Sequence, residues 1–295
     1  MLLKQKKRLF WIYALPTLAI FVTFVVIPFC YNIYLAMSNW DGFSKTVNYI
    51  GLKNFKELIH DKAFYNALWN NVKMLLIGTV FTMGIALFFA IVLTRSRLRE
   101  REFYRILFFF PNMLSVVIVG MLWAFIFNAS FGLLNAFLEL VGLGDLIHVW
   151  LGELKTALPA LCVPWIWSSV GYYMVLFISA IDNIPHEIYE AASLDGANLW
   201  QQSILVIIPM IKEMMRTAIV FFIINAFSNT YTLVDIMTEG GPAGATDVIS
   251  YYMYQSAFEY NRFGYASAIG VFLFLIMFVL AMIFLAATKS DSLEY

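Results

Sequence analysis

Six long apolar runs constrain this chain more than any other feature of its sequence. They lie at about 9–36, 74–94, 107–127, 158–181, 217–236 and 264–288. A helix needs about 20 mostly apolar residues to cross a bilayer. The runs are continuous and do not alternate apolar with polar residues, which indicates helices and not barrel strands. The sequence therefore predicts an all-α membrane protein with six transmembrane helices.

The composition agrees with a membrane location. Of the 295 residues, 62% are hydrophobic and 13% are charged, whereas soluble domains carry about 25% charged residues. The basic start of the chain precedes an apolar run that is too long for a signal peptide and has no cleavage site after it, so it is interpreted as the first span. Cys30 and Cys162 lie in apolar runs and the three histidines are far apart, so we expect no disulfide, no metal site and no cofactor. The net charge of zero gives no indication of a nucleic-acid partner.

The basic residues predict the orientation of the spans. Arg95, Arg97, Arg99, Arg101 and Arg105 lie close together in one short connection. Short connections rich in arginine stay on the cytoplasmic side. The sequence thus predicts a multi-pass protein of the cell (inner or plasma) membrane, with a cytoplasmic tail at 1–8, a permease domain at 9–288 and a second cytoplasmic tail at 289–295. A loop at about 182–214 would lie on the same side.

The spans carry no ionisable residue in their interior, and Asp235 comes closest, near the outer end of the fifth. Proton-coupled transporters place such groups within the membrane. The chain also contains no P-loop motif and no convincing nucleophile–base pair, so it is expected not to be an enzyme. A proton symporter is therefore not expected, whereas Na⁺ coupling through neutral oxygens stays an alternative. If this chain moves a solute uphill by ATP, the energy has to come from another chain.

Neutral polar side chains do occur in the spans, together with aromatic rings. Amides and hydroxyls can match the hydroxyls of an uncharged polyhydroxylated solute, and rings can stack on its apolar faces. The alternative is that these residues only hydrogen-bond neighbouring helices. Ser169 and Tyr173 also lie in the fourth span. The predicted substrate pathway comprises Asn112, Ser115, Ser168, Tyr172, Asn225, Asn229 and Thr230.

The 182–214 loop is polar and lies between two apolar runs. Pro185 suits the first position of a helix, and Glu190 lies near the positive end of that helix dipole. Ala191 and Ala192 keep one face of this helix thin, and Gly196 lets the chain turn without a Cβ clash. A second short helix and Pro209 follow. An ordinary amphipathic connector would show similar features.

The spacing in this loop adds a resemblance. The residues Glu190-Ala191-Ala192, then three residues, Gly196, nine residues and Val206-Ile207-Ile208-Pro209 resemble the EAA loop of binding-protein-dependent ABC importer permeases. The family prefers Ile and Leu where this chain has Val206 and Ile208. The segment Gly240-Gly241-Pro242 is similar to the sugar-importing branch of the family. The large extra outside domain of some maltose-type permeases is absent.

The resemblance implies an assembly. Its expected partners are a second homologous permease, two ATP-binding ATPase subunits and an external substrate-binding protein, besides membrane lipid. The residues implied to couple to the ATPase are Glu190, Ala191, Ala192, Asp195 and Gly196. The implied substrate is a carbohydrate delivered by the binding protein. An importer of another solute, such as glycerol-3-phosphate, and an ATP-independent channel or facilitator remain as alternatives.

Overall fold

The computed structural model describes residues 11, 14–95, 99–228 and 230–287. The tails predicted at 1–8 and 289–295 lie outside the described residues. Within the described residues the regular structure is helical, apart from one isolated bridge between Ser38 and Tyr49. The all-α prediction is therefore confirmed.

The chain divides into two compact units. The first comprises 1–61 and 253–275. It contains the π-helix η1 (Val22–Val26), α2 (Ile27–Ala36), α3 (Lys53–His60), the π-helix η4 (Gln255–Glu259) and the first half of α15 (Phe263–Ala287). Ala36 of α2 packs against Ala268 and Val271 of α15. Arg262 binds the carboxylate of Glu57 at 2.7 Å, which fixes the start of α15 beside α3.

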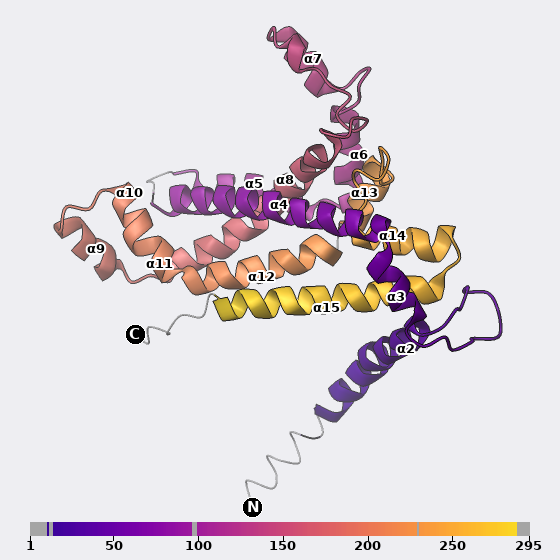
Figure 1. Cartoon of the computed structure of the whole chain (residues 1–295). Helices are drawn as coiled ribbons and strands as arrows, with labels where there is room; N and C mark the ends of the chain where they lie inside the picture. Colours follow the sequence, from indigo (N-terminus) through magenta and orange to yellow (C-terminus); the bar gives the residue numbers. More distant parts are fainter. Residues whose placement is uncertain (1–10, 12–13, 96–98, 229, 288–295) are drawn as a thin grey trace, which may run out of the picture. The chain divides into compact units, whose positions relative to one another are not determined.

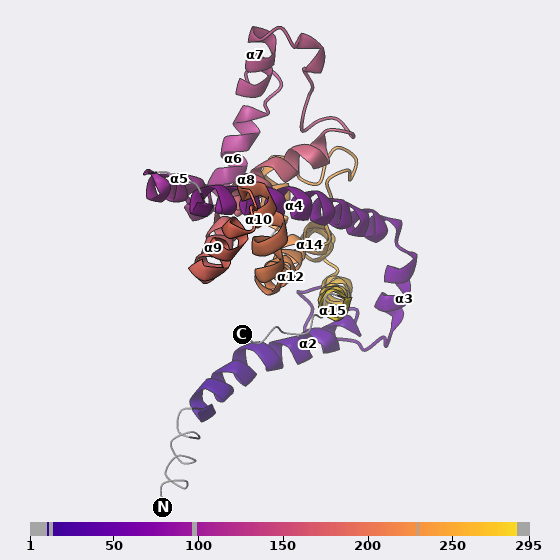
Figure 2. The ribbon, with the colours of Figure 1, turned by 90° about the vertical axis from the view of Figure 1, so that its left-hand side faces the viewer.

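The second unit comprises 62–252 and 276–295. In it, α4 contacts α8 and α12, α5 packs on α8, and α6 packs on α13 (Figures 1 and 2). Its core lies where α4, α8 and α12 meet, around the fully buried Met174, Phe177 and Phe222. Its helices are α4 (Lys62–Arg95), α5 (Arg101–Met113), α6 (Val116–Ile126), α7 (Leu133–Leu140), η2 (Gly144–Leu146), α8 (Ala157–Asp182), α9 (His186–Leu194), α10 (Leu199–Gln202), η3 (Ser203–Ile207), α11 (Ile208–Met210), α12 (Lys212–Ser228) and α13 (Tyr231–Met237), with most of α14 (Ile249–Tyr254).

The helix α4 is longer than the sequence predicts. It runs unbroken for 34 residues, or about 51 Å at 1.5 Å per residue. The predicted span at 74–94 is only its later part. The earlier residues contain polar side chains that are typical of a loop. Asn70 and Asn71 are nevertheless buried, as are Phe64 and Ala67. Their amides bond to backbone groups at Gly244, Asp247, Ala226 and Ile249.

Four helical stretches of the described chain are long and apolar enough to cross a membrane: Ala14–Ala36, Lys62–Arg95, Ala157–Asp182 and Phe263–Ala286. Two bent pairs, Arg101–Met113 with Val116–Ile126 and Lys212–Phe227 with Tyr231–Met237, bring the total to six if each pair is one span.

The third span is not the continuous helix expected at 107–127, because α5 and α6 meet at an angle of 95°. Leu114 is extended, and Ser115 starts the new helix by accepting a hydrogen bond from the amide of Val117 at 3.4 Å. A serine in this position satisfies a backbone donor that the broken helix would leave unpaired.

Candidate functional site

The 182–214 loop forms a helical hairpin within the second unit. After α8 ends at Asp182, α9 and α10 follow as two short helices, and the π-helix η3 and α11 lead into α12 (Figure 1). Pro185 is the residue that precedes α9 and has extended backbone angles, so it is not the first helical residue that the sequence predicts. Proline suits either position because it has no amide hydrogen to leave unpaired.

Gly196 ends α9 in a left-handed conformation. Its φ is +81°, its amide donates to the Ser193 carbonyl at 3.1 Å, and the amide of Ala197 donates to the Ala192 carbonyl at 2.9 Å. This pair of bonds is a Schellman motif, which favours glycine because a Cβ is strained at positive φ. A Cβ at Gly196 would meet no atom within 4 Å. The glycine is thus required by the backbone conformation and not by a clash with neighbours.

The turn after Gly196 is closed by a capping box. The side chain of Asn198 accepts from the amide of Gln201, and the amide of Asn198 donates to the side chain of Gln201, both at 2.9 Å. These bonds satisfy backbone donors at the start of α10, which has only four residues. The two short helices and the turn between them are therefore fixed by local hydrogen bonds.

The implied coupling residues lie on the outer side of α9. Glu190, Ala191, Asp195 and Gly196 are exposed, and Ala192 is half-buried. Leu194, which is not among the predicted coupling residues, lies between them and is 89% exposed. An exposed leucine between small and acidic residues gives this face an apolar centre on which a partner protein could pack.

The inner side of α9 is anchored by Tyr189, which is 6% exposed. The guanidinium carbon of Arg95, the last residue of α4, lies 3.8 Å from the centre of the tyrosine ring. Burial raises the pKa of Tyr189 above its usual value, and the nearby positive charge of Arg95 offsets only part of this rise. The sequence indicates only an orienting role for Arg95, because a contact between residues 94 positions apart leaves no trace in local spacing.

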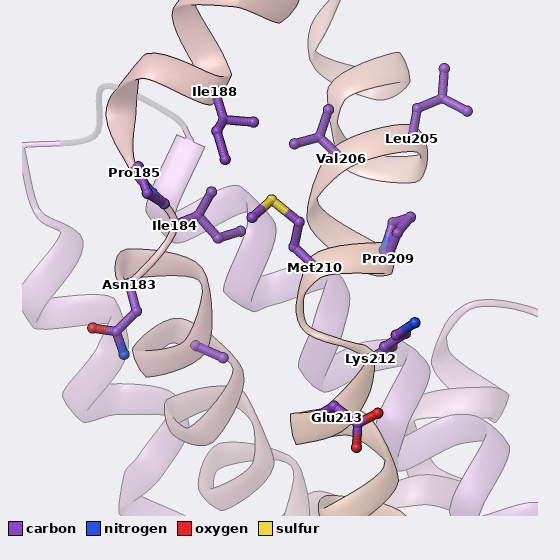
Figure 3. A pocket seen from close by; sticks show the side chains of 11 residues that line it. Asn183, Ile184, Pro185, Ile188, Leu205, Val206, Pro209, Met210, Lys212 and Glu213 are labelled. Carbon is purple, nitrogen blue, oxygen red and sulfur yellow. The ribbon is translucent and has the colours of Figure 1, made fainter. Parts of the chain in front are cut away.

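A mainly apolar cavity of about 720 Å³ lies beside the hairpin (Figure 3). Ile184 and Ile188 line it on the α9 side, and Val206 and Met210 line it on the side of η3 and α11. The base of the hairpin is therefore not filled by side chains. The lining residues are Ala180, Asn183, Ile184, Pro185, Ile188, Leu205, Val206, Pro209, Met210, Lys212 and Glu213.

A second cavity, of about 270 Å³, lies between α5, α8 and α12, and its lining contains no charged side chain. It brings together three residues of the predicted pathway: Asn112, Tyr172 and Asn225. The indole of Trp165 stacks on Phe222 with ring centres 4.6 Å apart. This cavity, here called the neutral cavity, is lined by Asn112, Trp165, Ser169, Tyr172, Tyr173, Phe221, Phe222 and Asn225.

Ser169 lines the neutral cavity, whereas the predicted Ser168 does not. The hydroxyl of Ser168 donates to the Trp165 carbonyl at 3.1 Å, and its own carbonyl accepts from the side chain of Asn112 at 3.2 Å. Residues 165, 169 and 172 share one helical face, since side chains three or four positions apart are neighbours. That spacing was the signal for Ser169.

Two other predicted pathway residues, Ser115 and Thr230, do not line this cavity. Ser115 caps α6, and Thr230 is buried with its hydroxyl donating to the Ala226 carbonyl at 3.1 Å. Asn229 lies outside the described residues. The cavity is therefore lined by side chains from α5, α8 and α12.

The position of Asn112 depends on a close approach of two helices. A Cβ added at Gly171 of α8 would overlap the carbonyl of Phe108 and the Cα of Phe109 in α5. Small residues permit such backbone contact between membrane helices. Gly171 thus lets α5 approach α8 closely enough for Asn112 to reach the Ser168 carbonyl.

Known proteins resemble this chain over most of its length. Residues 78–289 match the family described as the binding-protein-dependent transport system inner membrane component. YurN of Bacillus subtilis (strain 168), named a probable ABC transporter permease protein, is 38% identical over 294 residues, which is 99% of this chain and 100% of YurN. NgcF of Streptomyces coelicolor, a diacetylchitobiose uptake system permease protein, is 37% identical over 273 residues, covering 90% of this chain and 77% of NgcF.

The fold matches a solved transporter. A bacterial alginate ABC transporter, solved in complex with an alginate pentasaccharide-bound periplasmic protein, superposes with a TM-score of 0.85 at 23% identity, covering 97% of this chain and 96% of that chain. The likeness shows that the two chains share a fold. The chain therefore belongs to the family of binding-protein-dependent transport system inner membrane components, the permease subunits of ABC importers.

Proposed function

We propose that this permease subunit imports a neutral carbohydrate and that α9 is the helix through which an ATPase partner drives the transport. ATP hydrolysis in such a system belongs to a separate subunit. The remaining partners would be a second homologous permease, a second ATPase and a substrate-binding protein on the outside. A periplasmic protein is bound to the solved alginate transporter, which supports the last of these.

The observation that carries the carbohydrate proposal is the uncharged neutral cavity. Its amides and hydroxyls can both donate and accept hydrogen bonds, as sugar hydroxyls require. Its rings offer flat apolar faces, and NgcF, at 37% identity, is named for uptake of a disaccharide. Its volume of about 270 Å³ is slightly below the range of ligand pockets, about 300–1,000 Å³. We infer that the second permease supplies the remaining contacts.

Glycerol-3-phosphate is a weaker candidate on the same grounds. A phosphate group is bound by arginine or lysine side chains or by a helix N-terminus. No lysine or arginine lines the neutral cavity in the described chain. The family assignment also favours an ATP-driven importer over the stand-alone channel or facilitator.

The positions of the basic residues support a cytoplasmic hairpin. Arg95 contacts Tyr189 of α9, and Arg101 binds Asp182 at the end of α8 at 2.7 Å. The arginine-rich connection and the hairpin therefore share one end of this unit. Because arginine-rich connections stay inside, we propose that the hairpin and both termini are cytoplasmic.

Replacement of cavity residues tests the substrate assignment. Tyr172→Leu and Asn225→Leu are expected to lower uptake, because each removes a hydrogen-bonding side chain worth about 1–2 kcal/mol, or roughly five- to thirtyfold in affinity. Uptake of labelled diacetylchitobiose, maltose and glycerol-3-phosphate is measured in vesicles holding the complete importer. Phe125→Leu is the control, because Phe125 of α6 is 66% exposed and does not line the cavity.

Selective loss of saccharide uptake in the two cavity variants is the expected result. Unchanged uptake in both variants would mean that Tyr172 and Asn225 serve only to pack the helices and do not bind the solute. Transport of glycerol-3-phosphate but of neither sugar would replace the carbohydrate proposal with the phosphate alternative.

A further inference from the structure

Arg95 joins three helices of the second unit through one guanidinium group. It ends α4, its guanidinium carbon lies 3.8 Å from the centre of the Tyr189 ring in α9, and its Nη2 donates to the side-chain oxygen of Gln202 in α10 at 2.8 Å. An arginine over an aromatic ring is attracted by the ring's negative face. The planar guanidinium group can stack and donate at the same time, which a lysine ammonium group cannot do equally well.

Gln202 extends this contact across the hairpin. It is only 4% exposed, and its side-chain nitrogen donates to the Ser193 hydroxyl and the Ala197 carbonyl, both at 3.0 Å. The Ser193 hydroxyl donates to the Tyr189 carbonyl at 2.8 Å. These hydrogen bonds link both short helices and the turn between them, and the contact of Arg95 with the Tyr189 ring closes the set. A buried amide whose donors and acceptor are paired in this way holds one geometry.

The simplest explanation of Arg95 is that it only sets the membrane orientation. That role needs a positive charge in the connection but no particular contact, and Arg99 meets it while remaining exposed. Arg95 is instead partly buried and points onto the hairpin. The specific contacts of Arg95 with Tyr189 and Gln202 are not needed for membrane orientation.

The base of the hairpin contacts α4 through apolar side chains, since Ile207 lies in the same buried cluster as Ala90 and Leu93. The cavity of about 720 Å³ separates α9 from η3 and α11 at the base. The backbone widens to a π-helix at Ser203–Ile207 just before Pro209. Such π-turns are frequent at functional sites. The link through Arg95 adds to this apolar contact a polar attachment between α4 and the two short helices of the hairpin.

We propose that Arg95 is a positioning residue that fastens the hairpin to the end of α4, so that α9 and α4 move as one body during the ATPase-driven step. The inference rests on the proposed coupling role of α9. It assigns to α4, which reaches from the hairpin past Trp165 and Phe222 of the neutral cavity, the transfer of that movement. Loss of the link would let ATP be hydrolysed without moving the cavity walls.

The test measures ATP hydrolysis and solute uptake in the same vesicles holding the complete importer. Arg95→Met is expected to raise the ATP hydrolysed per solute about fivefold or more, the scale of losing a charged hydrogen bond and a ring contact. Arg95→Lys keeps the charge and should give an intermediate ratio. Arg99→Met removes the same charge without touching the hairpin and should leave the ratio unchanged.

Tyr189 provides a second pair of variants that keeps the proposal falsifiable if Arg95→Met does not assemble. Tyr189→Phe retains the ring and should transport normally, whereas Tyr189→Leu stays apolar but removes the ring and should uncouple. In the double variant Arg95→Met/Tyr189→Leu the effects should not add, because both break one contact.

Two different failures can be told apart. A native importer whose uptake does not depend on ATP would overturn the proposed function itself. A native importer that is coupled, with equal ATP-to-solute ratios in the Arg95→Met, Tyr189→Leu and Arg99→Met variants, would overturn only the role of Arg95.

Discussion

At the scale of single residues, the structure changes the reasons given for several predictions. Gly196 was expected to avoid a clash, but it is surrounded by open space and is needed for its φ of +81°. Ser168 was expected in the pathway, but Ser169 lines the cavity. Residue type and spacing can predict that a helix ends at Gly196. They cannot show which side of a helix meets a cavity until its neighbours are known.

Gly196 offers a direct test of the hairpin turn. Gly196→Val is expected to strain the left-handed position by roughly 1–2 kcal/mol or more, because a β-branched side chain is poorly accommodated there. Gly196→Asn should be tolerated, since asparagine adopts this conformation more readily. ATP-dependent uptake is measured per assembled complex. Near-normal uptake by the valine variant would argue against a required turn at the end of α9.

At the scale of helices, apolar length predicts most of the fold. Six runs were expected and six candidate spans are described if each bent pair counts once. The extension of α4 to Lys62 was not predicted, because its asparagines look like loop residues until their backbone partners at 226–249 are known. The 95° bend between α5 and α6 was also missed, since an apolar run gives length but not direction.

The contact between α5 and α8 can be tested with a glycine pair. Gly171→Ala should push α5 away, since the added Cβ overlaps backbone atoms that cannot rotate aside, and overpacking of this kind destabilises by about 1–3 kcal/mol. Gly84→Ala in α4 is the control, because a Cβ there meets no atom within 4 Å and alanine favours helix by up to about 1 kcal/mol. Thermal unfolding of the purified complex should show a lower Tm for Gly171→Ala alone. Equal Tm values would contradict the close approach.

At the scale of the whole molecule, the second unit contains both features that the proposed function requires. The neutral cavity and the hairpin are each built on α8 and α12, and α4 passes both. The identity of the family followed from a long spaced motif in the hairpin. The Arg95 contact and the shape of the cavity did not follow from the sequence, because they depend on residues brought together from distant parts of the chain.

The most direct test of the account is to identify what touches the outer face of α9. A photoreactive amino acid is placed at Ala191, which is exposed on that face, and separately at Leu140 of α7, which is 83% exposed. The complex is irradiated in its native membrane, purified, and the cross-linked partner is identified by mass spectrometry. A P-loop ATPase joined at position 191 and not at position 140 is the expected result. Assembled complex containing the ATPase, but with no cross-link to it from position 191, would contradict the role of α9 as the coupling helix.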